Sequence, residues 1–290
     1  MSVLLLGGPT AAGKSDLAVE LAEQHDAVLV SADAMTVYRG LDVGTAKPSP
    51  EILARHPHAC INVREVGEAF AVADFVDAVD HALRRHPRVI VVGGTPFYLQ
   101  AMARPLASLP PADPTVRAQL ESLPDPHASL AVVDPASASR LHPNDRVRVI
   151  RALEVHAITG RTLTELHAAG PRRAPFDVTV AWLDRAELRT RIDHRLQMMR
   201  EAGYVAEVRR VLAQPGARAT KPLRSFAYRH MVDHVDGRIS LDEALRRTAR
   251  DTWRFARKQR TWARGLGWEP IHADAARGRA AACFSTIGDG

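Results

Sequence analysis

Cysteine is scarce in this chain, and long apolar stretches are absent from it. The two cysteines, Cys60 and Cys283, form neither a disulfide framework nor a metal-binding spacing. No apolar run approaches the about 20 residues that cross a membrane, and residues 3–6 are too short a run for a signal peptide. We therefore expect a protein of the reducing cytoplasm, with no membrane partner.

The composition is that of a folded globular chain with a modest basic excess. Its 290 residues suffice for one or two domains with a core. There are 39 Lys and Arg against 33 Asp and Glu, which gives a formal net charge of +6. This excess alone argues only weakly for a nucleic-acid partner, so the positions of the arginines matter more.

The strongest motif lies in the first fifteen residues. An apolar run precedes Gly8-x-x-x-x-Gly13-Lys14-Ser15, and apolar residues at helical spacing follow. This order of strand, glycine-rich loop and helix is typical of a phosphate-binding P-loop, whose N–H groups and helix end attract anions. Lys14 adds a charge for the phosphates, and the Ser15 hydroxyl can bind Mg²⁺. The predicted diphosphate-binding residues are Gly8, Pro9, Thr10, Ala11, Ala12, Gly13, Lys14 and Ser15.

Two further buried strands are predicted to end near this loop. Residues 27–33 end in Asp33, which should face the phosphate site, because ligands bind at the carboxyl ends of parallel strands. The alternative is that Asp33 only caps a turn. Residues 88–95 end in Gly-Gly-Thr95 and lack the Walker B aspartate with which nucleotide hydrolases hold Mg²⁺. The small residues leave room for a ligand, and the Thr95 hydroxyl can bind it.

The rest of the chain suggests one inserted segment. Residues 72–83 have the spacing of a core helix, and frequent prolines from Pro105 onward mark a change to short helical pieces. Residues 146–155 form a helix with three arginines, which Gly160 should end. Residues 176–183 alternate like a strand that returns to the sheet.

Two later helices carry many arginines. Asp184-x-x-Glu187 and Ser240-x-x-Glu243 are capping-box patterns that should open them. The first contains Arg189, Arg191 and Arg195. This density favours binding to a nucleic-acid backbone over a merely solvated face. The basic residues of the second helix are Arg246, Arg247, Arg250, Arg254, Arg257, Lys258 and Arg260.

Together these elements predict an α/β fold: a P-loop NTPase-like core with a mostly parallel sheet flanked by helices, plus an inserted helical subdomain. We assign residues 1–110 and 174–290 to the core, which includes the C-terminal basic helices. Residues 111–173 are assigned to the subdomain.

The chain resembles the bacterial tRNA dimethylallyltransferases, also called isopentenyl-diphosphate:tRNA transferases. Its motifs fall in the order of that family over nearly all of residues 2–270. A P-loop alone is common, but the combination is specific. The matching segments are GPTAAGKS at 8–15, SAD at 31–33, YRGLDVGTAKP at 38–48, VGGT at 92–95, HPND at 142–145, RALE at 151–154, TLTEL at 162–166 and RKQRTW at 257–262.

The resemblance implies transfer of a dimethylallyl group from dimethylallyl diphosphate to N6 of the adenosine 3′-adjacent to the anticodon. Asp33 would be the general base, with Thr95, Arg224 and Arg229 also catalytic, and Arg224 or Arg229 neutralising the diphosphate. Mg²⁺ would be the cofactor, and we expect a monomer that binds the anticodon stem-loop partly through residues 111–173. The tRNA-binding residues would be Asp33, Ala34, Met35, Thr36, Thr95, Arg117, Val147, Arg148, Val149, Ile150 and Arg151.

The chain departs from the family pattern at a few positions. The family usually has Asp-Ser-x-Gln-x-Tyr where residues 33–38 read DAMTVY, and it has glycine at Ala227. The zinc-finger cysteines of eukaryotic relatives are missing from the sequence.

Two other functions share the P-loop. One is a kinase for a small molecule or nucleotide, and the other is a nucleotide-regulated RNA-binding module without chemistry. In most proteins a P-loop binds ATP, and the motif itself cannot distinguish ATP from a prenyl diphosphate. The missing Walker B carboxylate argues against both alternatives.

Overall fold

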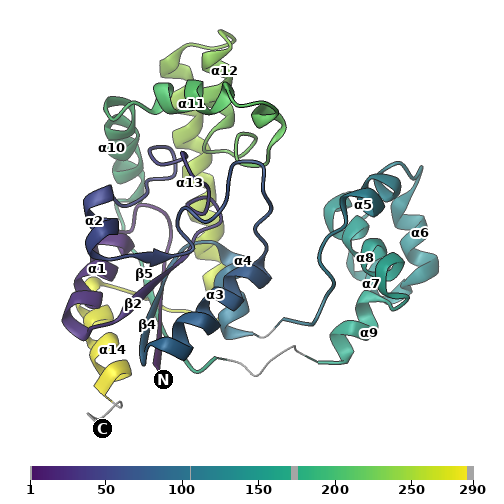
Figure 1. The fold of residues 1–290 in the computed structure, drawn as a ribbon, viewed down its shortest axis with the longest axis horizontal. Coiled ribbons are helices and arrows are strands. Elements are labelled where there is room, and N and C mark those ends of the chain that lie inside the picture. Colours follow the sequence, from purple (N-terminus) through teal and green to yellow (C-terminus); the bar gives the residue numbers. More distant parts are fainter. Residues whose placement is uncertain (1, 105, 171–175, 286–290) are drawn as a thin grey trace. The chain divides into compact units, whose positions relative to one another are not determined.

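The computed structural model describes residues 2–104, 106–170 and 176–285. It divides into two compact units (Figure 1). We call Met1–Ala103 with Phe176–Gly290 the core unit, and Arg104–Pro175 the small unit. Pro105 and the predicted boundary at residue 173 lie outside the described residues.

A parallel sheet forms the centre of the core unit. Its six strands have the order β3-β2-β4-β1-β5-β6, and every pairing is parallel. The strands predicted at 27–33, 88–95 and 176–183 are confirmed, with ends that shift by up to two residues. Their apolar runs are explained by helices on both faces, which bury a parallel sheet completely. The strands are β1 Ser2–Gly7, β2 Val28–Ala32, β3 His58–Ala59, β4 Arg88–Gly93, β5 Val178–Leu183 and β6 Pro270–Ile271.

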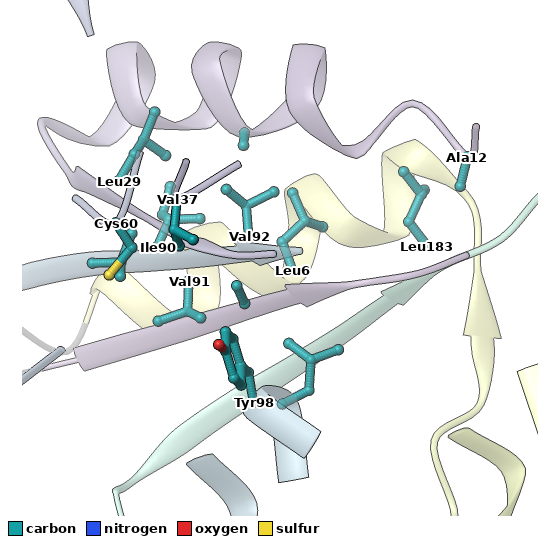
Figure 2. Close-up of a cluster of buried hydrophobic side chains, with 14 of the residues drawn as sticks. Leu6, Ala12, Leu29, Val37, Cys60, Ile90, Val91, Val92, Tyr98 and Leu183 are labelled. Carbon is teal, nitrogen blue, oxygen red and sulfur yellow. The ribbon is translucent and has the colours of Figure 1, made fainter. Parts of the chain in front are cut away.

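Helices cover both faces of this sheet. Helices α1 and α14 pack on one face, and α3 and α4 lie on the other (Figure 1). Figure 2 shows Val91 of β4 on the same side of the sheet as Tyr98 of α4, whereas Leu6 of β1 and Val92 of β4 point to the opposite side. The Tyr98 ring stacks on Phe75 of α3 at a centroid distance of 4.8 Å, so the predicted core helix is confirmed. The helices of this unit are α1 Lys14–His25, α2 Pro50–Arg55, α3 Val72–Arg85, α4 Pro96–Ala103, α10 Leu188–Glu201, α11 Tyr204–Leu212, the 3₁₀ helix η1 Ala217–Ala219, α12 Arg229–Val235, α13 Leu241–Gly265 and α14 Ala273–Ser285.

The prolines of the small unit start its helices. Asp113, Asp125 and Asp134 each precede a proline, and each carboxylate accepts hydrogen bonds from backbone N–H groups of the helix that follows. An N-cap aspartate followed by proline is a favourable helix start, because proline's missing N–H would have no partner there. Gly160 ends α8 at φ +69°, as predicted. The helices are α5 Pro114–Glu121, α6 Pro126–Val133, α7 Pro135–Arg140, α8 Arg146–Thr159 and α9 Leu163–Ala168.

The prediction of a capping box at Asp184 is wrong. Helix α10 begins at Leu188, and Glu187 precedes it without a side-chain cap. The Asp184 carboxylate instead accepts two hydrogen bonds of 2.8 Å from the guanidinium of Arg260. An ion pair with α13 therefore outweighs the local cap. Ser240 does cap α13, since its hydroxyl accepts a hydrogen bond from the N–H of Glu243.

The two cysteines are buried in the core unit. Burial raises the pKa of the Cys60 thiol to about 12, so this thiol stays protonated at neutral pH. The described residues contain no group of three or more His, Cys, Asp or Glu that could hold a metal ion. None of the described helices is long and apolar enough to cross a membrane.

Replacing Gly93 with alanine is expected to destabilise the core unit by about 1–3 kcal/mol. A Cβ there would lie 2.3 Å from the carbonyl oxygen of Ala32, a backbone atom of the neighbouring strand that cannot easily move. Urea unfolding measures the change. The control is Gly278→Ala in α14, where the Cβ meets nothing within 4 Å, and a gain of about 0.5–1 kcal/mol is expected. Equal effects of the two substitutions would contradict this account.

Candidate active site

Four strands end at the same level at one edge of the sheet. Gly7 of β1 pairs with Gly93 of β4 and with Trp182 of β5, and Ala32 of β2 pairs with the same Gly93. In an open parallel sheet, ligands bind at this edge. The loops that leave these strand ends contain three groups predicted from the sequence: the P-loop, Asp33 and Thr95.

The P-loop, residues 8–13, leads from β1 into α1. A side chain at Gly8 would be excluded, since its Cβ would lie 2.3 Å from the carbonyl oxygen of Leu183. Gly13 has the left-handed φ of +91° and provides no side-chain cap for α1. The first N–H groups of α1 are therefore available to an anion, which the positive end of the helix dipole also favours.

Lys14 is the first residue of α1 and is folded back onto the loop. Its ammonium donates a hydrogen bond of 2.8 Å to the carbonyl oxygen of Pro9. Burial and the nearby charge of Arg195 lower the pKa of Lys14 to about 7, against the opposing effects of Asp33 and Asp184. Such a lysine gains its full charge when an anion binds beside it.

Two arginines contact the P-loop directly. Arg185 donates from Nε to the carbonyl oxygen of Ala12 at 2.9 Å, and Arg191 donates from Nε to that of Ala11 at 2.7 Å. One terminal nitrogen of each guanidinium lies within 4 Å of the Cβ position at Gly13. Burial and the charge of Arg191 lower the pKa of Arg195 nearby. This cluster of positive charge faces the start of α1.

The contact of these arginines with the P-loop was not among the predictions from the sequence. Arg191 and Arg195 were placed on a basic helix, with nucleic acid expected there, and Arg185 was not mentioned. One signal was present: Arg185 follows the end of β5 by two residues, at the edge where ligands bind.

Asp33 directly follows β2. It both closes a turn and faces the phosphate loop, the two roles considered from the sequence. Its Oδ1 accepts a hydrogen bond of 2.8 Å from the N–H of Met35, so the side chain does close a turn. It also interacts electrostatically with Lys14. Burial raises the pKa of Asp33, although the bond from Met35 and the charge of Lys14 oppose this. A half-buried carboxylate with a raised pKa is suited to accept a proton.

Thr95 holds the Asp33 turn against β4. Its hydroxyl accepts a hydrogen bond of 3.0 Å from the N–H of Ala34, and its own N–H donates to Ala32 at 3.1 Å. The Thr36 side chain points inward, where it is buried and bonded to the Ser31 hydroxyl at 3.0 Å. Contact of Thr36 with tRNA stays a prediction, and with its side chain buried it would have to use the backbone.

The role expected of Arg224 or Arg229 at the diphosphate stays a prediction. Arg229 pairs with Asp251 of α13. Arg224 is exposed. Within the described residues, neither guanidinium makes a hydrogen bond to the P-loop, whereas Arg185 and Arg191 do.

A buried carboxylate shapes the loop at residues 38–48. Glu207 of α11 accepts hydrogen bonds from the N–H groups of Asp42, Val43 and Gly44 at 2.6–3.0 Å, and from the Tyr228 hydroxyl at 2.8 Å. A Cβ on Gly44 would lie 2.5 Å from the Tyr204 ring. The sequence predicted only an ordered loop here, because Glu207, which holds the loop, lies on a helix far away in the sequence.

Two arginines of the small unit that were predicted to bind tRNA form ion pairs within the unit. Arg117 and Arg151 both pair with Glu154, whose side chain is completely buried, at 2.8 and 2.6 Å. The side chains of Val149 and Ile150 are also buried, and the predicted contact of these two residues with tRNA stays a prediction. Arg148 and Val147 are exposed on the first turn of α8.

Helix α13 presents a basic face. Five of its exposed cations recur at helical spacing: Arg246, Arg250, Arg254, Arg257 and Lys258. Acidic neighbours pair with some of them, as Glu243 does with Arg246 and Asp251 with Arg250. An open groove of about 720 Å³ lies between α10 and α13, with Trp253, Arg246 and Arg250 at its wall. Stacking and backbone contacts to RNA use side chains of these kinds.

Comparison with known proteins points to one family. The IPP transferase family model matches residues 36–266. The tRNA dimethylallyltransferase 1 of Citrifermentans bemidjiense is 44% identical over 90% of this chain and 89% of its own. The tRNA dimethylallyltransferase 2 of Geotalea uraniireducens is 39% identical with the same coverage. Neither is named as a kinase.

A solved structure has the same fold. The tRNA isopentenylpyrophosphate transferase of Bacillus halodurans superposes with a TM-score of 0.68 and 30% identity, over 98% of this chain and 97% of its own. The predicted P-loop NTPase-like core is thereby confirmed.

Binding of inorganic diphosphate is expected to weaken as pH rises above about 7. In the free protein the pKa of Lys14 is about 7, and a bound anion raises it, so binding takes up a proton above neutral pH. Affinity should fall by up to about tenfold per pH unit between pH 7 and 9. Calorimetry measures the diphosphate affinity of the wild type and of Lys14→Met at each pH. The titration of diphosphate itself affects both proteins equally, so it cancels in the ratio of the two affinities. A ratio independent of pH would contradict the low pKa.

Proposed function

The chain belongs to the IPP transferase family, and we propose on that basis that it transfers a dimethylallyl group from dimethylallyl diphosphate to N6 of the adenosine 3′-adjacent to the anticodon of tRNA. One observation carries the proposal for this site: Asp33 follows β2 at the same sheet edge where the P-loop with Lys14 follows β1, and the two charged groups interact electrostatically. A donor diphosphate and an acceptor amine need these two groups side by side.

The loop would hold the diphosphate through its charge. As the bond between the allylic carbon and oxygen breaks, the electron pair stays on the diphosphate, whose negative charge grows. Backbone N–H groups of α1, Lys14, Arg185 and Arg191 would stabilise that charge at fixed positions. This assigns to Arg185 and Arg191 the role first expected of Arg224 or Arg229.

Asp33 would accept the proton that leaves the adenine. An exocyclic amine is a weak nucleophile, and loss of its N6 proton as the carbon–nitrogen bond forms makes it competent. The proton moves to the Asp33 carboxylate, and the raised pKa of that group favours the transfer. Thr95 keeps the carboxylate's turn in place through its bond to Ala34.

The loop also fits a divalent cation, which we propose to be Mg²⁺. Ser15 is exposed beside Lys14, and its hydroxyl is the kind of hard oxygen ligand that Mg²⁺ accepts. Mg²⁺ usually takes one or two protein oxygens together with substrate phosphates. Ser15 and the diphosphate oxygens would hold it, and the cation would neutralise part of the diphosphate charge.

The RNA would bind to basic surfaces on each unit. The exposed arginines of α13 in the core unit and Arg146 and Arg148 in the small unit can contact phosphates without reading sequence. Residues 111–173 would thus grip the anticodon stem-loop. The target base must leave its stack to reach Asp33, which is easiest in a loop. We place the reaction in the cytoplasm, with the protein as a monomer.

Asp33→Asn is expected to lower single-turnover prenylation by about 10²-fold or more, because the general base is lost. Binding of tRNA should barely change. Mass spectrometry of unmodified tRNA follows the product. The matched control is Asp26→Asn, at the opposite end of β2 in a left-handed conformation that asparagine tolerates, and it should keep the full rate. Near-normal transfer by Asp33→Asn would refute the assignment.

Dimethylallyl diphosphate is expected to be consumed only in the presence of tRNA, and ATP to be neither hydrolysed nor required. Each donor is supplied separately with unmodified tRNA, and the product is identified by its mass. Strand β4 ends without the carboxylate on which nucleotide hydrolysis relies. Turnover of ATP alone, or a need for ATP in the transfer, would favour the kinase instead.

A further inference from the structure

One side chain of the basic helix α13 reaches into the candidate active site. Gln259 is only 1% exposed, and both ends of its amide are used. Its Oε1 accepts a hydrogen bond of 3.0 Å from the N–H of Thr10 in the P-loop. Its Nε2 donates one of 2.6 Å to the carbonyl oxygen of Gly94, in the loop after β4. A single amide therefore ties two site loops together.

The two hydrogen-bond partners of Gln259 lie on different sides of the site, one near the proposed donor and one near the proposed acceptor. Thr10 belongs to the loop that would hold the diphosphate. Gly94 precedes Thr95, whose hydroxyl holds Ala34 next to Asp33. The chain of contacts from Thr10 through Gln259 to Thr95 thus sets the separation of the phosphate loop and the proposed base.

The fit around this amide is tight. A Cβ on Gly94 would lie 2.4 Å from Nε2 of Gln259 and 2.9 Å from the carbonyl oxygen of Gly8. Gly94 is therefore required by the glutamine as well as by the P-loop. A shorter or apolar side chain at 259 would leave the buried Gly94 oxygen without this donor, which carries a desolvation cost.

The next residue of α13 extends the same arrangement. Arg260 binds the Asp184 carboxylate through two nitrogens at 2.8 Å and the carbonyl oxygen of Arg185 at 2.6 Å. Two successive residues of one helix thus hold the loops after β1, β4 and β5.

We propose that Gln259 is a positioning residue for prenyl transfer, which fixes the P-loop relative to Asp33 through its two amide hydrogen bonds. The inference rests on the proposed function for the transfer step, but its effect on the P-loop does not. Misplacing reacting groups by about 1 Å costs about 10²-fold in rate. The amide therefore affects both diphosphate binding and the rate of the chemical step.

The test uses Gln259→Leu and Gln259→Glu in the full chain. Leucine removes both hydrogen bonds. It should weaken binding of inorganic diphosphate by about tenfold and lower single-turnover transfer at saturating donor by about 10–10²-fold at every pH. An ionised glutamate at 259 can still accept the hydrogen bond from the N–H of Thr10. Its other carboxylate oxygen cannot donate to the carbonyl oxygen of Gly94, so that bond is replaced by a repulsion between two oxygens. When protonated, it can donate to Gly94 and restore both bonds.

The pH profile separates positioning from a general loss of structure. Burial raises the pKa of a carboxyl group, so the ratio of the Gln259→Glu rate to the wild-type rate should rise toward one as pH falls from about 8.5 to about 5.5. Taking the ratio removes the part of the pH dependence that both proteins have in common. The control is Gln214→Glu, whose side chain is exposed, and it should show a ratio near one throughout.

Two results would overturn the proposal. One is a folded Gln259→Leu protein with wild-type diphosphate affinity and transfer rate. The other is a Gln259→Glu ratio that stays flat with pH. A wild type that binds diphosphate but never prenylates tRNA would refute the proposed function instead, and the diphosphate affinities of the variants would still decide the role of Gln259.

Discussion

The register of four parallel strands is the constraint on which the candidate active site depends. Because Gly7, Ala32, Gly93 and Trp182 lie side by side, the loops after them open at one edge. Small residues at these strand ends allow the loops to approach closely. A Cβ at Gly8 or Gly93 would fall 2.3 Å from a backbone oxygen of a neighbouring segment. The close approach of backbone segments therefore sets the frame of the site, and the charged side chains are placed on that frame.

Buried carboxylates pair with some of the arginines that the sequence contains. Glu154 neutralises Arg117 and Arg151 in the small unit, and Asp251 neutralises Arg229 in the core unit. Removing one partner of such a pair leaves an uncompensated buried charge, so these arginines serve the fold. The number of arginines therefore overstates the surface that RNA can use. The exposed arginines of α13 and those on the first turn of α8 stay available for such contacts.

Local patterns predicted the elements well and their partners poorly. The strand, loop and helix around Lys14, the strand before Asp33 and the end of α8 at Gly160 depend on neighbours within a few residues, and the structure confirms them. The capping box at Asp184 failed because that carboxylate binds the guanidinium of Arg260, 76 residues away, and the helix begins only at Leu188. A pattern of four residues carries no information on such a partner.

The sequence by itself determined that a P-loop, a carboxylate and a Gly-Gly-Thr turn follow three buried strands. In a parallel sheet that is enough to predict that they meet. Only the tertiary structure decided which side chains complete the site: Arg185 and Arg191 on the P-loop carbonyls, Glu207 beneath the 38–48 loop, and Gln259 between Thr10 and Gly94. These contacts join residues up to 249 positions apart. Their geometry depends on how whole helices pack on the sheet, which no local spacing of residues encodes.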